Sequence, residues 1–418
     1  MGERFDVEKV RALFPGLERR VNGVPAVFLD GPAGSQVPRS VAEAVSGYLL
    51  GSNANGGGVF ATSVATDALF DDARAVVADF LGTSDPDSVV FGPNMTSLTF
   101  TLARSLANTW TPEDEVVVCR TEHDANFTPW VLYAEAVGAT VRVVEVNTHD
   151  GTLDLESLEG ALSHRTRLVA VGCAGNALGS VNPVGAIVSR VRDASDAFVF
   201  LDAVHYAPHR LIEVERWGCD FLACSAYKFF GPHIGILWGR RELMEQLPVD
   251  KLRPPKDVPP GRWMTGTPSY EGIAGTRAAV EYLAELGRSV SGSASLGRRD
   301  AITAAYRAIG AYETALTQRL LTGLTKLPSF RVHGVTDPER TEDRVATISF
   351  THARLSPRQI SEALAARGIF VWDGNFYALP ITEALGLEPD GVVRVGLLHY
   401  NTEAEVDRLL TALAEITA

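Results

Sequence analysis

The chain has 418 residues, of which 46% are hydrophobic and 21% are charged, and its formal net charge at pH 7 is -13. This composition is that of a globular protein with room for one large and one smaller domain. The acidic balance argues against nucleic-acid partners, and the absence of a secretory signal or long apolar stretch predicts a cytoplasmic protein with no membrane partner.

From about residue 86, short β-branched runs alternate with helical stretches. The runs cover residues 88–91, 115–119, 167–171, 197–201 and 235–238. Continuous apolar runs separated by amphipathic helices are typical of strands that are covered on both faces of a mostly parallel sheet. They predict a large α/β domain, which we assign to residues 18–285.

A second unit follows a loop that is rich in proline, over residues 248–262. Beyond a Gly- and Ser-containing stretch at 287–297, the pattern predicts a long helix from about Arg298 to Lys326. Strands near 330 and 345–350 and terminal helices come after it. We assign residues 286–418, together with 1–17, to a smaller α+β domain.

Polar side chains follow the predicted strands of the large domain. In such a sheet the ligand site lies beyond the carboxyl ends of the strands, so residues directly after each run are candidates for binding and chemistry. The candidates in chain order are Asn94, Met95, Thr96, Ser97, Glu122, His123, Asp124, Asn176, Asp202 and His205.

Lys228 is one of five lysines among 38 basic residues, and it lies in Ser225-Ala226-Tyr227-Lys228-Phe229-Phe230. Apolar surroundings disfavour the ammonium form, so this amine can become a nucleophile for a carbonyl group. The alternative is a lysine whose stem covers Phe229 while its amine stays in water. Ser225 and Lys228 also match the Ser-x-x-Lys motif of penicillin-recognising enzymes, but the Ser-Asp-Asn and Lys-Thr-Gly strings of those enzymes are missing.

Asp202 and Lys228 together are what a pyridoxal-phosphate enzyme needs. The lysine holds the cofactor as an imine, and a buried carboxylate keeps the pyridine nitrogen protonated. The helix start at residues 94–97 offers N–H groups to a phosphate, although these residues also make an ordinary helix N-cap. His123 suits stacking on a flat ring or acid–base work. Residues 122–124 also suggest a metal ligand group, but no second ligand cluster supports one, and we predict no metal.

Three further residues admit two readings each. His205 and His209 have the spacing of a zinc pair, but Pro208 disfavours a regular helix there. We therefore assign His205 to the cofactor phenolate and His209 to structure. Arg394 lies in the apolar run 393–396, where an unpaired charge is costly. It is either a clamp for the carboxylate of an amino acid or one half of an internal ion pair.

In order and over nearly the whole chain, from Phe28 to Thr402, these motifs resemble the class V aminotransferase superfamily of fold-type I pyridoxal-phosphate enzymes. The resemblance is strongest to its cysteine desulfurase branch. It implies that Lys228 carries the cofactor, that Asp202 pairs with the pyridine nitrogen, that His123 stacks on the ring and that His205 meets the ring oxygen. It also implies a large domain with a mostly parallel seven-stranded sheet, and further cofactor contacts from Met95, Thr96, Asn176, Ser225 and Tyr227.

Gly266-Thr267-Pro268 resembles a family segment whose threonine reaches the phosphate of the neighbouring subunit. The resemblance therefore implies that Thr267 contacts the cofactor across a homodimer with shared active sites. Asn176 matches a residue near both cofactor and substrate.

The chain departs from the desulfurase pattern in one loop. Desulfurases carry a cysteine there that accepts sulfur as a persulfide, whereas Tyr377 occupies that position in this sequence. A phenol has no such chemistry. Cys119 and Cys173, near strand ends, are the alternative acceptors, although we interpret all four cysteines first as small buried hydrophobes. Tyr377 and Trp372 predict a substrate pocket more aromatic than that of a desulfurase.

The leading hypothesis is an enzyme that binds a free amino acid or small derivative through Arg394, forms an external aldimine and uses Lys228 to take the Cα proton. A desulfurase-like lyase reaction, with β-elimination and C–S cleavage, ranks first, and aminotransfer or epimerisation ranks second. A non-catalytic scaffold that retains the fold is the alternative of another class. The presence of Lys228, Asp202 and Arg394 favours the enzyme.

Overall fold

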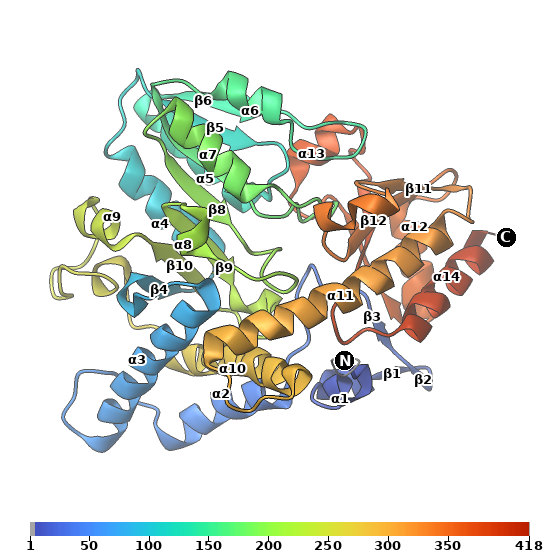
Figure 1. Cartoon of the computed structure of the whole chain (residues 1–418), viewed down its shortest axis with the longest axis horizontal. Helices are drawn as coiled ribbons and strands as arrows, with labels where there is room; N and C mark the ends of the chain where they lie inside the picture. Colours follow the sequence, from blue (N-terminus) through green and yellow to red (C-terminus); the bar gives the residue numbers. More distant parts are fainter. Residues whose placement is uncertain (1–4, 418) are drawn as a thin grey trace.

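The computed structural model describes residues 5–417 and is built on two sheets of different kinds (Figure 1). The larger sheet has seven strands in the order β4-β10-β9-β8-β7-β5-β6. β10 runs antiparallel to both of its neighbours, and the other pairs are parallel. The predicted mostly parallel, seven-stranded α/β sheet is therefore confirmed. Its strands are β4 (Val89–Gly92), β5 (Glu115–Cys119), β6 (Thr140–Val144), β7 (Thr166–Gly172), β8 (Phe198–Asp202), β9 (Phe221–Ser225) and β10 (Gly235–Gly239).

The apolar runs arise because alternate residues of one strand enter two different cores. In β5, Val117 packs in the core on one face of the sheet, while Val116 and Val118 pack in the core on the other face. Successive side chains of a strand point to opposite faces, so a strand covered twice is apolar throughout. β6 differs because it is an edge strand with only one fully buried residue, and it was not among the five predicted runs.

Helices cover both faces of the larger sheet (Figure 1). Buried residues of α4 and α5 belong to one core, and those of α3, α7 and α10 belong to the other. These helices are α3 (Ala61–Leu81), α4 (Met95–Ala107), α5 (Thr128–Val137), α7 (Val184–Ala194) and α10 (Tyr270–Ser291).

The smaller sheet has four antiparallel strands in the order β11-β12-β15-β14. They are β11 (Phe330–His333), β12 (Thr347–His352), β14 (Trp372–Gly374) and β15 (Val392–Gly396), and they pack with α12 (Pro357–Ala366) and α14 (Glu403–Thr417). Ser356 and Gln359 form a reciprocal capping box with Pro357 in the first turn of α12, which fixes where that helix begins. The second α+β unit is as predicted.

Helix α11 (Arg298–Leu324) connects the two units. It begins at the predicted residue and ends two residues before the predicted end. Ile302 and Ile309 in its first half pack in a core of the larger sheet, whereas Leu316 and Leu320 pack in the core of the smaller sheet. In Figure 1 this helix runs from α10 towards β12 and α14.

The N-terminal segment contacts both units. Phe14 packs in a core of the larger sheet, but Val27 and Leu29 pack with the smaller sheet, where β3 (Val27–Phe28) pairs with β13 (Ile369–Phe370). The predicted domain boundaries, between residues 17 and 18 and between residues 285 and 286, stay a prediction. Residues on each side of the first boundary contact the unit opposite to the one assigned to them.

The other elements are short or peripheral. They are α1 (Val7–Arg11), α2 (Arg39–Gly51), α6 (Leu155–Ala161), α8 (Val214–Trp217), α9 (Arg241–Gln246), α13 (Leu379–Ala384), β1 (Arg20–Val21), β2 (Val24–Pro25), and the 3-10 turns η1 (Pro15–Glu18), η2 (Pro86–Ser88), η3 (Asp124–Asn126), η4 (Ala226–Lys228), η5 (Gly261–Trp263) and η6 (Pro338–Asp343). Across residues 5–417 no helix combines the length and apolar character that a membrane crossing requires.

Candidate active site

A cavity of about 310 Å³ lies where the carboxyl ends of β5, β7, β8 and β9 face the loop around β14 and residue Arg394 of β15. Every residue to which the sequence assigns a cofactor or substrate role, except Thr267, lines it, whereas the candidates Ser97 and Asp124 do not. The lining residues with such a role are Met95, Thr96, His123, Asn176, Asp202, His205, Ser225, Tyr227, Lys228, Trp372, Tyr377 and Arg394. The predicted convergence of these residues at one edge of the sheet is therefore observed.

Thr267 lies elsewhere. It lines a separate cavity of about 550 Å³ together with His233 and the neighbouring segment 263–269. The sequence assigns Thr267 to the site of a neighbouring subunit, and that assignment stays a prediction.

Lys228 is half-buried at the end of η4, directly after β9. Burial lowers the pKa of its amine to about 7, helped by the charge of Arg394, while the charge of Asp202 opposes the shift. Within residues 5–417 its only hydrogen-bond acceptor is the carbonyl oxygen of Pro32, and Nζ lies 4.8 Å from the ring centre of Tyr227. An amine in these surroundings loses its proton easily. The amine contacts the carbonyl oxygen of Pro32, so the alternative in which it stays in water is not what the structure shows.

Asp202 is the last residue of β8 and is buried. Burial raises the pKa of its carboxyl to about 6, although the N–H of Val204, 2.8 Å from Oδ1, and the charge of Lys228 favour the ionised form. At neutral pH the carboxylate is therefore mostly ionised and faces the cavity that contains Lys228.

His123 follows β5 and accepts a hydrogen bond at Nδ1 from the N–H of Ala125, at 3.0 Å. Burial lowers the pKa of its imidazole to about 4, with a further contribution from the charge of Lys228. The neutral ring therefore carries its proton on Nε2. Its centre lies 5.6 Å from the ring centre of Tyr377, at an interplanar angle of 31°.

His205 and His209 are both buried, but their surroundings differ. His205 lines the cavity, and its Nε2 lies 3.1 Å from Oγ1 of Thr347. Burial holds the pKa of His205 well below its usual value, which keeps the ring neutral. His209 lies outside the cavity with Nδ1 2.7 Å from Glu313, and the chain between the two histidines forms turns rather than a regular helix.

The start of α4 forms one end of the cavity. Asn94 caps the helix by accepting a hydrogen bond from the N–H of Ser97, and Ser225 accepts one from the N–H of Met95, at 3.1 Å. The N-cap reading of this segment is correct, and the same residues also line the cavity. The N–H groups of Met95 and Ser97 are therefore occupied, whereas that of Thr96 has no acceptor among residues 5–417 and is left for an anion at this end of the cavity.

Arg394 is buried in the middle of β15. Its Nη1 donates to the carbonyl oxygen of Asn176 at 2.8 Å, and its guanidinium carbon lies 3.9 Å from the ring centre of Phe376. Burial lowers the pKa of Arg394 to about 9, so it stays charged at neutral pH. None of the ion pairs found within residues 5–417 involves it, although the charge of Asp30 acts to raise its pKa. Direct pairing with a carboxylate is therefore not observed among those residues, and the clamp assignment stays a prediction.

The loop after β14 forms the mouth of the cavity. Trp372 is 51% exposed and Tyr377 is 74% exposed, so both rings rim the opening. Asn176 donates through Nδ2 to the carbonyl oxygen of Phe376 at 2.9 Å. The N–H of Asp124 donates to the carbonyl oxygen of Tyr377 at 2.6 Å. Sequence reasoning missed Phe376, although its place beside Tyr377 in the departing loop was a usable signal.

Glu122 is the second residue that sequence reasoning did not assign, beyond noting the acidic neighbours of His123. It is buried in the cavity wall, and burial raises the pKa of its carboxyl to about 8. It accepts hydrogen bonds from the N–H of Gly172 at 2.8 Å, from Nδ2 of Asn126 at 2.6 Å and from Oγ1 of Thr121 at 3.2 Å. These donors favour the ionised form but do not outweigh burial and the nearby charge of Asp202.

All four cysteines are buried, at positions 119, 173, 219 and 224, and none of them lines the cavity. Burial raises the pKa of Cys119 and Cys173 well above the usual thiol value. Neither thiol has the exposure or the ionisation that a sulfur acceptor needs. The prediction that the cysteines are small buried hydrophobes is confirmed.

Comparison with known proteins gives a consistent picture. The Aminotransferase class-V family model matches residues 27–409. The chain is 33% identical to a probable cysteine desulfurase of Streptomyces coelicolor, covering 99% of this chain and 97% of the relative. It is 34% identical to aminotransferase-like protein FGM3 of Gibberella zeae, covering 98% of each. The apo structure of a cysteine desulfurase from Thermococcus onnurineus NA1 superposes with a TM-score of 0.87 at 27% identity, covering 99% of each chain.

Proposed function

Because the chain belongs to the class-V aminotransferase family of pyridoxal-phosphate-dependent enzymes, we propose that this cavity binds pyridoxal 5'-phosphate and acts at the Cα of a free amino acid or small derivative. The observation that carries the proposal is that Lys228, Asp202 and Arg394 line one cavity. An amine that loses its proton easily, a buried carboxylate and a buried cation without a carboxylate partner are three costly groups to keep together without a ligand.

The donor set fits the cofactor. When bound, the cofactor supplies an aldehyde that condenses with an amine and a pyridine ring that withdraws electrons from Cα. Lys228 would hold the aldehyde carbon, Asp202 the ring nitrogen, His123 the ring face and His205 the ring oxygen. Met95, Thr96, Ser225 and Tyr227 would hold the phosphate at the start of α4, and Asn176 would lie beside the ring and the substrate.

Lys228 is the group proposed to move the proton. A base works best when its pKa lies near the working pH, and the pKa of Lys228 is lowered to about 7. The neutral imidazole of His123 does not supply an acid at neutral pH, because its pKa is lowered to about 4. We therefore assign proton removal from Cα to the amine of Lys228 and ring stacking to His123.

The reaction that we favour is β-elimination with C–S cleavage, without a persulfide on this chain. The relatives named cysteine desulfurases support a sulfur-containing β-substituent. Tyr377 at the cavity mouth and the burial of all four cysteines support a reaction without a persulfide on this chain. Aminotransfer is the second candidate, and the relative named an aminotransferase-like protein supports it. We further propose a homodimer in which Thr267 reaches the partner's cofactor.

Lys228→Ala tests the proposal, with Lys251→Ala as the control because Lys251 lies outside the cavity. Wild type and the control should take up pyridoxal 5'-phosphate, absorb visible light and, after borohydride reduction, carry the cofactor covalently on the peptide containing Lys228. Lys228→Ala should lose the imine absorbance and should carry no cofactor on that peptide after reduction. Wild-type protein that stays colourless with added cofactor would favour the scaffold instead.

Product assays with L-cysteine and other amino acids then separate the two reactions. Elimination releases ammonia together with a keto acid and a sulfur product. Aminotransfer retains the amino group on the cofactor and releases only the keto acid. Ammonia release that is stoichiometric with the keto acid supports the lyase, and its absence would move the assignment to aminotransfer.

A further inference from the structure

We infer that Phe376 is a positioning residue for the substrate carboxylate: its ring covers one face of the Arg394 guanidinium and leaves in-plane N–H groups of that guanidinium for the ligand. This inference rests on the proposed function, since it concerns the amino acid bound in the same cavity. What it adds is the role of Phe376 in presenting Arg394 to the carboxylate of that amino acid.

The donors of Arg394 are unequally used. Nη1 donates one N–H to the carbonyl oxygen of Asn176. Nε is buried and has no acceptor within residues 5–417. Nη2 makes no hydrogen bond with the described residues, so Nη2 and the second N–H of Nη1 are left for a ligand. Two parallel N–H groups in one plane match a carboxylate, which is planar and has two acceptor oxygens.

Phe376 contacts a face of the guanidinium, whereas the hydrogen bond to Asn176 is made by an N–H group. Its ring centre is 3.9 Å from the guanidinium carbon, which is van der Waals contact with a cation over a π face. Arg394 is buried, its Nε has no acceptor within residues 5–417, and Asp30 acts on it only through its charge, so this ring is the side chain in direct contact with the guanidinium there. At 3.9 Å the ring leaves no room for water between itself and the guanidinium.

Phe376 itself is held in place by the residue that holds Arg394. Asn176 accepts from Arg394 through its backbone oxygen and donates through Nδ2 to the carbonyl oxygen of Phe376. Phe376 has a φ of 58°, which is uncommon for a residue with a side chain and requires support from its surroundings. Asn176, Phe376 and Arg394 thus form a closed set of contacts at the substrate end of the cavity.

The experiment compares two ligands that differ only in the carboxylate, L-alanine and ethylamine, on protein loaded with pyridoxal 5'-phosphate. The readout is the change in cofactor absorbance, from which a dissociation constant for each ligand is obtained. The ratio of the two constants isolates the contribution of the carboxylate. Wild type should bind L-alanine much more tightly than ethylamine.

Phe376→Leu keeps an apolar side chain of similar size but removes the aromatic face, and Phe376→Tyr keeps the face. The Leu variant should lower the ratio about tenfold, which corresponds to about 1.4 kcal/mol, while its constant for ethylamine changes less than twofold. The Tyr variant should keep the wild-type ratio. A general loss of stability would weaken both ligands equally and leave the ratio unchanged, which would overturn the inference.

Phe70→Leu is the matched control, because Phe70 lies under Arg74 with the guanidinium carbon 5.1 Å from its ring centre, far from the cavity lining. It should keep the wild-type ratio. If wild type takes up no cofactor, the proposed function fails. If wild type shows a large ratio and Phe376→Leu keeps it, the inference about Phe376 fails alone.

Discussion

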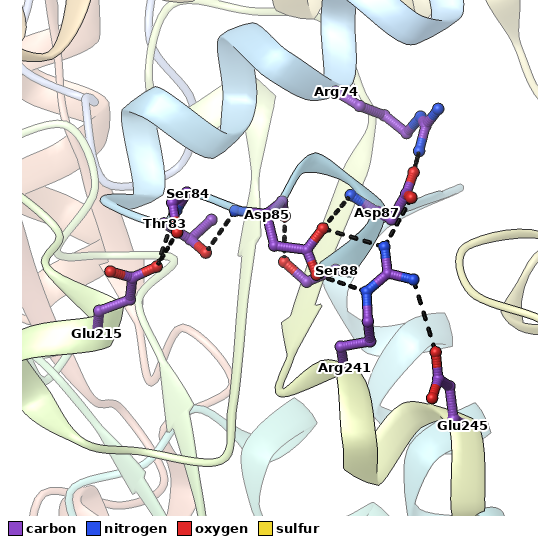
Figure 2. Close-up of polar contacts among 9 residues, drawn as sticks. All are labelled: Arg74, Thr83, Ser84, Asp85, Asp87, Ser88, Glu215, Arg241 and Glu245. Carbon is purple, nitrogen blue, oxygen red and sulfur yellow. Dashed lines mark hydrogen bonds and ion pairs between the residues drawn. The ribbon is translucent and has the colours of Figure 1, made fainter.

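Two arginines of this chain lie in opposite surroundings. Arg241, at the start of α9, donates to Asp85 at 2.8 Å and to Asp87 at 2.6 Å, and Glu245 lies 3.5 Å from it (Figure 2). Arg394 has a carbonyl oxygen and a phenyl ring in place of carboxylates. The first cation is paired directly with carboxylates of its own chain, whereas the second makes no direct ion pair with the described residues, and only the charge of Asp30 acts on it.

The difference shows in how each group titrates. The hydrogen bonds that Arg241 donates to Asp85 and Asp87 raise the pKa of Arg241, and burial lowers the pKa of Arg394 to about 9. Figure 2 shows the Arg241 cluster at the junction of η2 and α9, with Arg74 on the other side of Asp87. Charge neutralised in this way stabilises a fold, while a buried charge that lacks a carboxylate destabilises it and is a mark of a binding site.

The largest expected effect comes from Arg394→Met, which keeps the volume and removes the charge. Two charged hydrogen bonds contribute about 3 kcal/mol or more, so affinity for an amino acid should fall at least about 100-fold. The free energy of unfolding should stay the same or rise, because a buried cation without a carboxylate partner is replaced by an apolar side chain. Spectral titration and denaturant unfolding measure the two quantities.

Arg241→Met is the opposite case in the same comparison. It should leave amino acid affinity unchanged and lower stability. If Arg394→Met instead lowered stability as Arg241→Met does and left affinity intact, Arg394 would be a structural cation and the clamp assignment would be wrong.

The same contrast exists between two carboxylates at opposite ends of β5, Glu115 and Glu122. Burial raises the pKa of Glu122 from 4.5 to about 8, so the folded state keeps a proton that the unfolded chain releases. That contribution to stability is complete below pH 4.5 and is lost as the pH rises to about 8. The side chain in Glu122→Gln is neutral at every pH, so this variant does not have that loss. When the pH rises from 6 to 8, the free energy of unfolding of wild type should therefore fall by about 2 kcal/mol more than that of Glu122→Gln.

Glu115→Gln is the control for this pH dependence. Burial also acts on Glu115, but Ser163 and the charge of Arg142 outweigh it and lower the pKa. Its stabilising contribution is present above pH 4.5 and is lost only as the pH falls, so the variant should run parallel to wild type between pH 6 and 8. Unfolding curves of Glu122→Gln that are also parallel to wild type would show that Glu122 is ionised in the folded protein.

The fold was predictable because the buried strands of the larger sheet are continuous apolar runs in the sequence. Residues 115–119 are apolar because alternate side chains enter two cores, and this pattern is visible in the sequence alone. β6 was not predicted as a run because an edge strand buries little. β9 (Phe221–Ser225) was also not among the five runs, although it is buried throughout. The pairing of Val27 with Ile369 is likewise absent from any local pattern, because it joins residues far apart in the chain.

The site was predictable to the extent that its chemistry is local. Lys228 and Asp202 follow strands, and residues after strands meet at one edge of the sheet. Phe376 was missed, and Glu122 was named as a candidate without a role, for a physical reason. The first acts by contact with Arg394, and the pKa of the second is raised by burial and by the charge of Asp202; neither is encoded in sequence spacing.

The smallest effect is the stability loss in Arg241→Met. The side chain of Arg241 is 37% exposed, and exposed ion pairs contribute about 0.2 to 1 kcal/mol each, so the loss should be about 1 kcal/mol even though several carboxylates are involved. It should shrink in about 1 M salt, where charges are screened beyond roughly 3 Å. Arg358→Met, whose side chain is 72% exposed, should cost almost nothing. A loss at Arg241 that is insensitive to salt would mean that packing of its stem, rather than charge, holds η2 against α9.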